Sequence, residues 1–163
     1  MKPTTLVFVL RNDGEVLLGR KRRGFGAGKW NGFGGKVRDG ETLTACAVRE
    51  LVEETGLAAD PADLEWAGEL QFRFAEQSET DHPARIYRLY RVTGEPQMTE
   101  EMEPRWFLPS EVPYDEMWAA DRNWVPRVLA GERIAGEVVF AADGETVLSQ
   151  RLRTVEVDDA AES

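Results

Sequence analysis

The sequence predicts an α/β fold in which a mixed β-sheet lies between layers of helices. Two segments, residues 42–55 and 118–130, have the features of helices, and short apolar segments typical of strands flank each of them. A third observation is the turn sequence Asn12-Asp13-Gly14, which marks a β-hairpin near the start of the chain. Strands interleaved with helices along one chain favour a sheet that is covered by those helices.

The first part of the chain predicts a hairpin followed by a loop. Residues 4–10 and 15–20 form the two strands on either side of the turn. Residues 24–35 hold six glycines and predict an irregular loop. The loop contains Gly-Lys but is not a phosphate-binding P-loop, because its spacing differs and Trp30 stands where Ser or Thr is required.

The helix at 42–55 is bounded by glycines, and the rest of the chain continues the alternation. Gly56 suits a helix end that needs a positive φ, and Gly35 and Gly40 suit tight turns leading into the helix. Pro126 is expected to kink or delay the second helix, from Trp118 to about Ala130. The remaining segments are strands 64–75 and 84–93, an acidic connection 95–103, a short strand 105–108, and strands 134–141 and 145–154 around Ala142-Asp143-Gly144.

Length and charge narrow the class of protein. With 163 residues and 42% hydrophobic residues, the chain fits one domain at 1–157, followed by a short polar tail at 158–163. The net charge of −10 disfavours binding to a nucleic-acid polymer. The first apolar run is too short for a signal peptide or a membrane span, so a cytoplasmic protein without membrane contact is expected.

Histidine and cysteine chemistry has little support. The single cysteine, Cys46, excludes an internal disulfide and is expected to pack inside the first helix. The only histidine, His82, lies in a polar stretch between predicted strands and is expected to be a surface loop residue. Basic residues are instead concentrated between 20 and 38, where one or two of them are expected to face phosphates, with Lys21 or Arg23 as the candidates.

Three carboxylates in the first helix predict a metal site. Residues three and four apart share a helix face, so Glu50, Glu53 and Glu54 are expected to project together. Their mutual repulsion favours a cation among them, and Mg²⁺ is a hard ion that takes oxygen ligands from carboxylates, phosphates and water. We therefore expect Mg²⁺ at this face, with Mn²⁺ as a possible alternative.

The same run resembles the Nudix box, the signature of hydrolases that cleave a nucleoside diphosphate linked to another group. Every fixed place of the pattern is filled, by Gly35, Glu41, Arg49, Glu50, Leu51, Glu53, Glu54, Gly56 and Leu57. The resemblance implies an α/β/α sandwich with a mixed sheet, in agreement with the element order.

A wider resemblance is to the oxidised purine nucleoside triphosphatases of that family, the 8-oxo-dGTP diphosphatases that sanitise the nucleotide pool and so support DNA repair. It rests on residues 21–37 and further matches over nearly the whole chain: Glu101-Met102, Trp106-Phe107, Met117-Trp118, Trp124 with Pro126, and the last two strands. It implies Mg²⁺-dependent hydrolysis of such a triphosphate to the monophosphate and pyrophosphate, by a monomer.

Roles at the phosphate end follow from the resemblance. Glu50 and Glu54 would hold the metal together with the Gly35 carbonyl, and Glu53 would complete the site or deprotonate water. Glu101 would be a further ligand or base. Arg49 is expected to pair with a box carboxylate and fix its geometry.

Roles at the base end follow in the same way. Asn31 would read the edge of the purine, and Trp118 and Phe25 would pack against its plane. Phe72 and Phe74 would line the pocket, although plain core packing is equally open for them. Sugar and phosphate-side contacts would come from Thr5 and Lys21.

One position departs from the resembled enzymes. They carry two consecutive aspartates after the pocket Trp and one further residue, whereas here the run is Trp118-Ala119-Ala120-Asp121. Only Asp121 remains to contact the base, which weakens the expected preference for an oxidised purine. Two alternatives therefore stay open: a Nudix hydrolase of ADP-ribose, a dinucleoside polyphosphate or an RNA cap, and a catalytically silent nucleotide-binding module.

Overall fold

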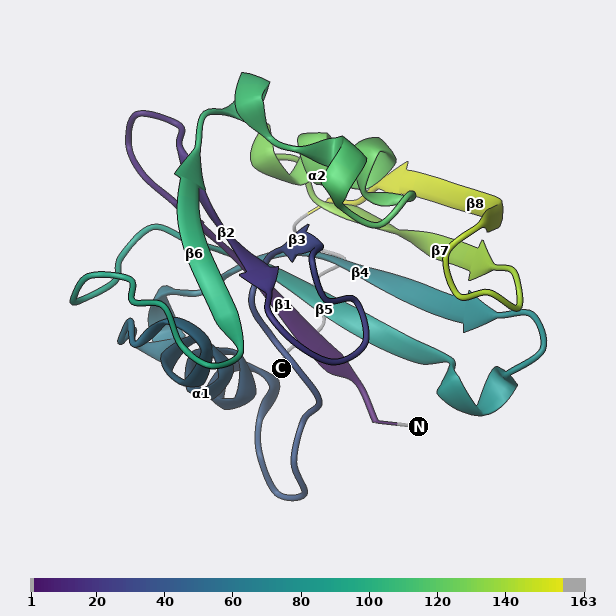
Figure 1. Ribbon diagram of the computed structural model, residues 1–163, viewed down its shortest axis with the longest axis horizontal. Helices are drawn as coiled ribbons and strands as arrows, with labels where there is room; N and C mark the ends of the chain where they lie inside the picture. Colours follow the sequence, from purple (N-terminus) through teal and green to yellow (C-terminus); the bar gives the residue numbers. More distant parts are fainter. Residues whose placement is uncertain (1, 157–163) are drawn as a thin grey trace.

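The computed structural model describes residues 2–156, which form a mixed eight-stranded sheet with one long helix on each face (Figure 1). The strand order is β3-β2-β1-β5-β4-β7-β8, and β6 pairs with β2. The pairs β1–β5 and β4–β7 are parallel, and the other pairs are antiparallel. The predicted α/β sandwich with a mixed sheet is confirmed.

The strands are β1 (Thr4–Leu10), β2 (Val16–Lys21), β3 (Trp30–Asn31), β4 (Glu65–Phe74), β5 (His82–Leu89), β6 (Met102–Phe107), β7 (Ile134–Phe140) and β8 (Val147–Thr154). The α-helices are α1 (Leu43–Thr55) and α2 (Asp121–Leu129). Short 3₁₀ helices lie at η1 (Pro61–Asp63), η2 (Ser78–Thr80), η3 (Pro109–Glu111) and η4 (Tyr114–Glu116).

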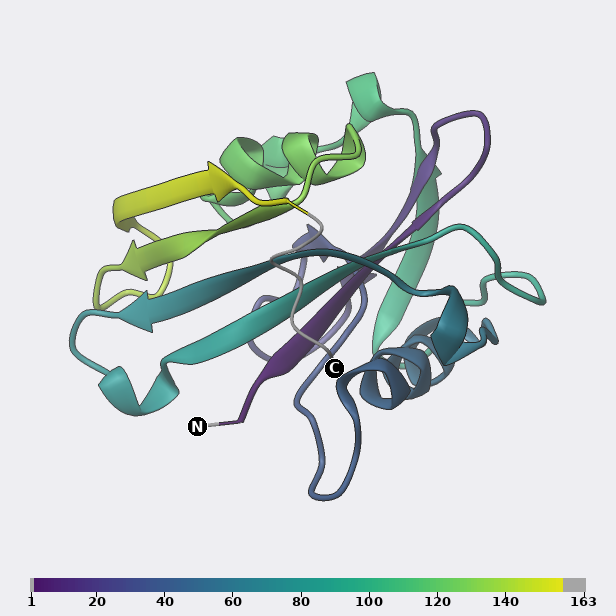
Figure 2. The same cartoon turned by 180° about the vertical axis from the view of Figure 1, so that it is seen from behind.

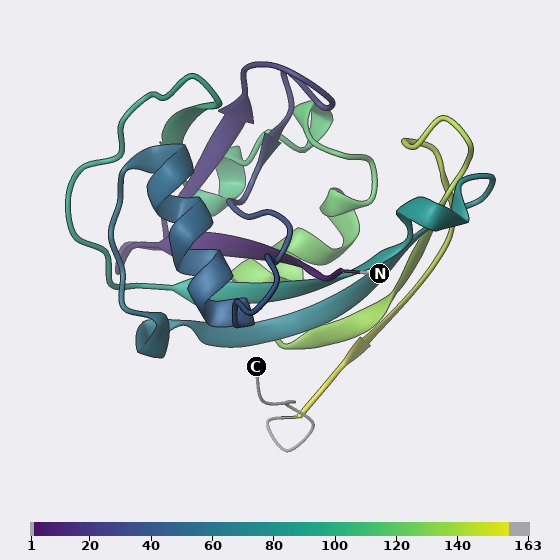
Figure 3. The same cartoon turned by 90° about the horizontal axis from the view of Figure 1, so that it is seen from below.

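Strand β1 is a shared wall between two apolar clusters, because successive side chains of a strand point to opposite faces. Val7 and Val9 belong to the cluster under α1, which includes Leu51. Phe8 and Leu10 belong to the cluster under α2, whose centre is the fully buried Trp124. Figures 2 and 3 show α1 and α2 covering opposite sides of the twisted sheet.

The predicted hairpin is present, and two predicted element boundaries differ from those in the structure. β1 and β2 are joined by a turn at which Gly14 has a φ of +90°, as the Asn-Asp-Gly sequence predicts. The loop at 24–35, expected to be irregular throughout, contains the short strand β3, which pairs with β2. The short strand expected at 105–108 is longer and begins at Met102, because the whole segment pairs with β2.

The second helix was expected to begin at Trp118, but α2 begins at Asp121. The Asp121 backbone N–H donates to the Trp118 carbonyl at 2.9 Å, and this turn takes the place of the first expected helical turn. Pro126 lies inside α2, so the helix tolerates it instead of ending there. The polar tail predicted at 158–163 lies outside the described residues.

No helix in the described part of the chain is both long enough and apolar enough to cross a membrane.

Candidate active site

Helix α1 carries three acids of the box, Glu50, Glu53 and Glu54, which we call the box acids. The Thr42 side chain caps the helix by accepting the Ala45 N–H at 3.1 Å, and Gly56, at a φ of +80°, ends it. Ala47 and Leu51 are fully buried on the inner face. The apolar face fixes the rotation of the helix, so the positions of the acids follow from packing.

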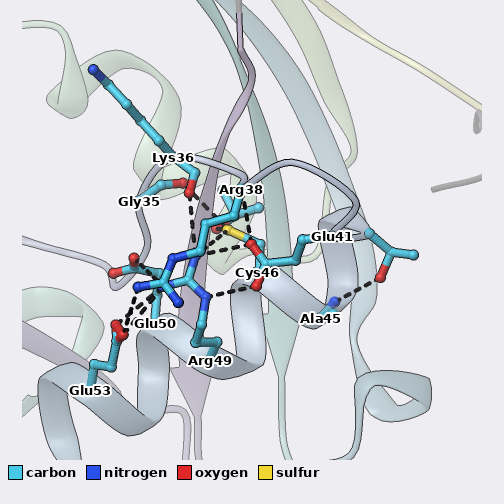
Figure 4. Close-up of polar contacts among 11 residues, drawn as sticks. Gly35, Lys36, Arg38, Glu41, Ala45, Cys46, Arg49, Glu50 and Glu53 are labelled. Carbon is cyan, nitrogen blue, oxygen red and sulfur yellow. Dashed lines mark hydrogen bonds and ion pairs between the residues drawn. The ribbon is translucent and has the colours of Figure 1, made fainter.

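Arg49 lies at the centre of a charged network, as Figure 4 shows. Its Nε donates to Glu41 Oε2 at 2.6 Å, and its Nη1 donates to Glu50 Oε1 at 2.9 Å and to Glu53 Oε2 at 3.1 Å. The Arg49 hydrogen bond is the main reason that the pKa of Glu41 falls to about 2, and the Arg38 backbone N–H adds to it. The predicted pairing of Arg49 with box carboxylates is confirmed, and Arg49 bridges Glu50 and Glu53.

Glu54 points elsewhere. Its Oε1 accepts the Gly34 N–H at 3.0 Å. Burial, followed by the negative charges of Glu50 and Glu101, raises the pKa of Glu54 to about 8, against the lowering effects of Gly34 and Lys21. A carboxylate in this position is stabilised when a cation lies beside it.

The expected single cluster of Glu50, Glu53 and Glu54 therefore divides into two parts. Residues at i+3 and i+4 diverge by about 100° around a helix, so Glu53 and Glu54 lie on opposite sides of Glu50. Among the residues that the structure describes, no three Asp, Glu, His or Cys side chains converge as a complete set of metal ligands. A bound ion would have to be shared between Glu50, Glu54 and other oxygen donors.

Gly35 leaves room for such an ion. A Cβ at this position would lie 2.7 Å from the Glu50 carboxyl carbon, so only glycine allows the carboxylate to come this close to the backbone. Gly35 was expected to serve a tight turn, but the described glycines with positive φ include Gly40 and not Gly35. The Gly35 carbonyl accepts the Thr5 N–H at 2.9 Å and, more weakly, the Cys46 thiol at 3.6 Å.

Glu101 lies on the other side of the acids, in the connection before β6. Its Oε1 accepts from Arg23 Nη2 at 2.8 Å, and this hydrogen bond is the main cause of its lowered pKa. Lys21 is close enough to favour the charged forms of both Glu54 and Glu101. The structure thus places Glu101 near the box acids, with Arg23 occupied by an ion pair.

A cavity of about 230 Å³ lies across β1 from α1, and we refer to it as the base cavity. Its walls are mainly aromatic and aliphatic. Seven of the eight predicted substrate contacts line it, namely Thr5, Phe25, Asn31, Phe72, Phe74, Trp118 and Asp121. The eighth, Lys21, does not line it and lies at the phosphate end.

The open side of the base cavity is formed by aromatic rings. Phe25 is 71% exposed and stacks on Trp118, with ring centroids 5.2 Å apart. Deeper inside, Phe72 and Phe74 each contact Phe140, with centroid separations of 5.9 and 5.2 Å. Phe72 and Phe74 therefore both pack on the core and line the cavity, so the two expectations for them are compatible.

The polar groups of the cavity are few. The Asn31 Oδ1 accepts the Gly32 N–H at 2.8 Å, which leaves the amide NH₂ as a donor. Asp121 is only 4% exposed, and burial raises its pKa to about 7, partly offset by the Trp118 N–H and by Lys29. Burial therefore favours the protonated form of this carboxyl group relative to an exposed aspartate.

His82 was wrongly expected to be a surface loop residue. It is the first residue of β5 and lines the base cavity, with its ring 5.6 Å from Phe72 and 6.2 Å from Phe74. Its Nδ1 lies 2.8 Å from the Thr80 carbonyl. The polar residues around His82 gave no strand pattern in the sequence, because β5 begins directly after the short 3₁₀ helix η2.

Six further residues of the cavity were not predicted as contacts, and the two aromatic ones among them are Trp124 and Phe140. Their aromatic character in predicted α2 and β7 was the available signal, but nothing in the sequence showed which face they would take. Ala120 is fully buried in the core beneath α2 and is not among the residues that line the cavity.

Comparisons with known proteins agree with this geometry. The NUDIX domain profile matches residues 1–128. The oxidized purine nucleoside triphosphate hydrolase of Danio rerio is 43% identical over 155 residues, covering 95% of this chain and 96% of that protein. The mouse protein of the same name is 43% identical over 152 residues, covering 93% and 94%. A crystal structure of MutT from Bacillus halodurans superposes with a TM-score of 0.79 at 27% identity, covering 93% of this chain and 97% of that one.

Proposed function

This chain belongs to the Nudix family, and from that premise we propose that it hydrolyses oxidised purine nucleoside triphosphates such as 8-oxo-dGTP to the monophosphate and pyrophosphate. The observation that carries the proposal is the position of β1 between the two halves of the site. Thr5 lines the base cavity, and its backbone N–H binds the Gly35 carbonyl at the acidic end. A nucleotide held in the cavity would extend its phosphates toward Glu50 and Glu54. The 43% identity to two oxidized purine nucleoside triphosphate hydrolases supports the same substrate.

Nudix hydrolases generally use divalent metal ions, and we propose Mg²⁺ for this chain, with Mn²⁺ able to replace it. The oxygen donors that fit a hard ion are Glu50, Glu54, the Gly35 carbonyl and, after release from Arg23, Glu101. A bound Mg²⁺ would neutralise phosphate charge and lower the pKa of water.

Glu53 is the proposed general base. Its side chain is exposed beside Glu50, and Arg49 holds it at 3.1 Å. Glu53 takes the proton as the water oxygen bonds to phosphorus, and the phosphoanhydride bond breaks to release the monophosphate and pyrophosphate. Arg49 acts through the carboxylates that it positions.

Lys21 is the proposed cation for the phosphates. Arg23 is already paired with Glu101 and Glu100, at 2.8 and 3.5 Å. Within the described residues, Lys21 has no carboxylate partner within 4.0 Å, so its ammonium is free to bind an anion.

At the base end, Asn31 and Asp121 supply the hydrogen bonds, and Trp118 and Phe25 supply the flat walls. Because the Asp121 pKa is about 7, its carboxyl can donate when protonated and accept when ionised. A purine edge that presents both donors and acceptors is the complementary partner.

The deciding experiment follows release of nucleotide products by chromatography from 8-oxo-dGTP, dGTP, dATP, ADP-ribose and a dinucleoside polyphosphate, each with and without Mg²⁺. We expect the highest kcat/KM with 8-oxo-dGTP and no turnover in EDTA. Cleavage of the phosphoanhydride bond of ADP-ribose or of the dinucleotide alone would instead support the other Nudix activities. Nucleotide binding without any turnover would support a silent binding module.

The same proposal places the enzyme in the cytoplasm, acting as a monomer on free nucleotides in nucleotide-pool sanitation. Light scattering after size-exclusion chromatography should give a mass near 18.3 kDa. A dimer mass would contradict the monomer.

A further inference from the structure

Lys29 connects three elements around the open side of the base cavity. It is the last residue of the glycine-rich loop at 22–29, between β2 and β3, and its Nζ lies 2.9 Å from Glu145 Oε1 in the turn between β7 and β8. The same ammonium lies 4.9 Å from the centre of the Trp118 ring. One cation thus contacts two loops that are more than 100 residues apart and a wall of the cavity.

The backbone of Lys29 is fixed, so its side chain has a firm base. Its N–H donates to the Gly26 carbonyl at 3.0 Å, and its carbonyl accepts the Lys21 N–H at 3.0 Å. The side chain is 27% exposed, whereas that of Glu145 is 56% exposed. The Lys29 side of the pair is therefore anchored by backbone hydrogen bonds and is less exposed than the Glu145 side.

The β7–β8 turn is stiff within itself. Asp143 accepts the backbone N–H groups of Glu145 and Thr146, both at 2.8 Å, and the Thr146 hydroxyl at 2.6 Å. Gly144 lines the base cavity, and a Cβ placed on it would lie 3.7 Å from the Phe25 ring. The turn is therefore a hydrogen-bonded unit beside the cavity opening, and Glu145 is its ionic contact with the opposite loop.

We propose that Lys29 and Glu145 form a clasp that holds the β7–β8 turn against the glycine-rich loop and sets how tightly the base cavity closes around a purine. Both are positioning residues. Lys29 orders the Trp118 wall directly through its cation–π contact, and Glu145 acts through Lys29. Lys29 also favours the ionised form of Asp121, which places it within electrostatic reach of the cavity floor. The inference rests on the proposed function, since it assumes that a base occupies the cavity.

The test uses Glu145→Gln, Lys29→Met and the double variant, measured for KM and kcat with 8-oxo-dGTP and for Kd with 8-oxo-dGMP. Glu145→Gln should raise KM and Kd about two- to fivefold with kcat unchanged, because an exposed ion pair contributes modestly. Lys29→Met should raise both about tenfold, because it also loses the Trp118 contact. The double variant should match Lys29→Met, since one clasp cannot be broken twice. Glu15→Gln is the matched control, because it breaks a similar 3.1 Å pair with Arg11 in the β1–β2 turn.

Hydrogen exchange tests the clasp independently of the proposed function. Amides of residues 141–146 should exchange faster in Glu145→Gln than in the wild type or in Glu15→Gln. Lack of turnover by the wild type would refute the proposed function, and the exchange result would then decide the clasp alone. Unchanged exchange in Glu145→Gln would overturn the clasp, as would effects on KM that multiply in the double variant.

Discussion

The acidic end and the base end of this site are built in different ways. At the acidic end, most groups come from one segment, residues 35–54, and Arg49 joins Glu41, Glu50 and Glu53 through direct ion pairs. At the base end, residues from β1, β3, β4, β5, β7, α2 and three loops meet around a mainly aromatic cavity. The difference indicates that the chemistry is determined locally, whereas the choice of base depends on how distant elements pack. A substitution at one end should therefore leave the property of the other end unchanged.

The largest expected effect is at the acidic end. Glu53→Gln should lower kcat by about 10²–10⁴-fold, equally for 8-oxo-dGTP and dGTP, because the proposed base is lost and the base cavity is untouched. Steady-state pyrophosphate release measures it, with circular dichroism to confirm folding and the exposed Glu116→Gln as control. Near-normal turnover in the folded variant would remove Glu53 from this role.

The next effect concerns stability at the base end. Ala120→Asp places a carboxyl in a fully buried position, so the free energy of unfolding should fall by roughly 3 kcal/mol. Urea titration gives the value, and Ala119→Asp, at the exposed neighbouring position, is the matched control. Equal stability of the two variants would mean that the side chain at 120 reaches the cavity.

Base selectivity should respond to Asn31. Removing its amide by Asn31→Ala should lower kcat/KM for 8-oxo-dGTP by about 10–100-fold, because a polar contact in a buried site is lost. The effect should appear mainly in KM and leave maximal turnover intact. Competition assays between 8-oxo-dGTP and dGTP measure the change, with the exposed Asn123→Ala as control. A fall in kcat alone would contradict the separate roles of the acidic end and the base end.

The smallest effect depends on pH. The pKa of Asp121 is about 7 in the folded chain, against an ordinary value of 3.8, so the unfolded chain releases this proton first. The contribution of Asp121 to stability therefore decreases as pH rises between these values. Relative to the wild type, Asp121→Asn should gain roughly 1 kcal/mol per pH unit between about pH 5 and 7. Thermal unfolding at several pH values tests this, and a constant difference would contradict it.

The two ends also differ in how far the sequence could predict them. The box acids lie in one helix, so periodicity and the Gly56 cap placed them correctly on one side of α1. Helix geometry separates Glu53 from Glu54, but it could not show that Glu54 accepts the Gly34 N–H, because that contact depends on the loop packed against the helix.

At the base end, residue types indicated a pocket, but tertiary contacts decided its walls. The cavity position of His82 depends on the exact start of β5 after a 3₁₀ turn, and a polar stretch gave no periodic signal for it. Lys29 and Glu145 meet only because β7 pairs in parallel with β4 and carries the turn to the glycine-rich loop. No local pattern encodes such a contact.

Strand β1 fixes the distance between the base cavity and the acidic end of the site. Because Thr5 lines the base cavity and its N–H donates to the Gly35 carbonyl, while its hydroxyl contacts Cys46 of α1, one stretch of extended backbone sets the separation between the base and acidic ends. A rigid spacing of this kind measures the substrate by length. A nucleotide with one phosphate fewer would place a different bond beside the acids. Binding in this site would therefore depend on the number of phosphates as well as on the base.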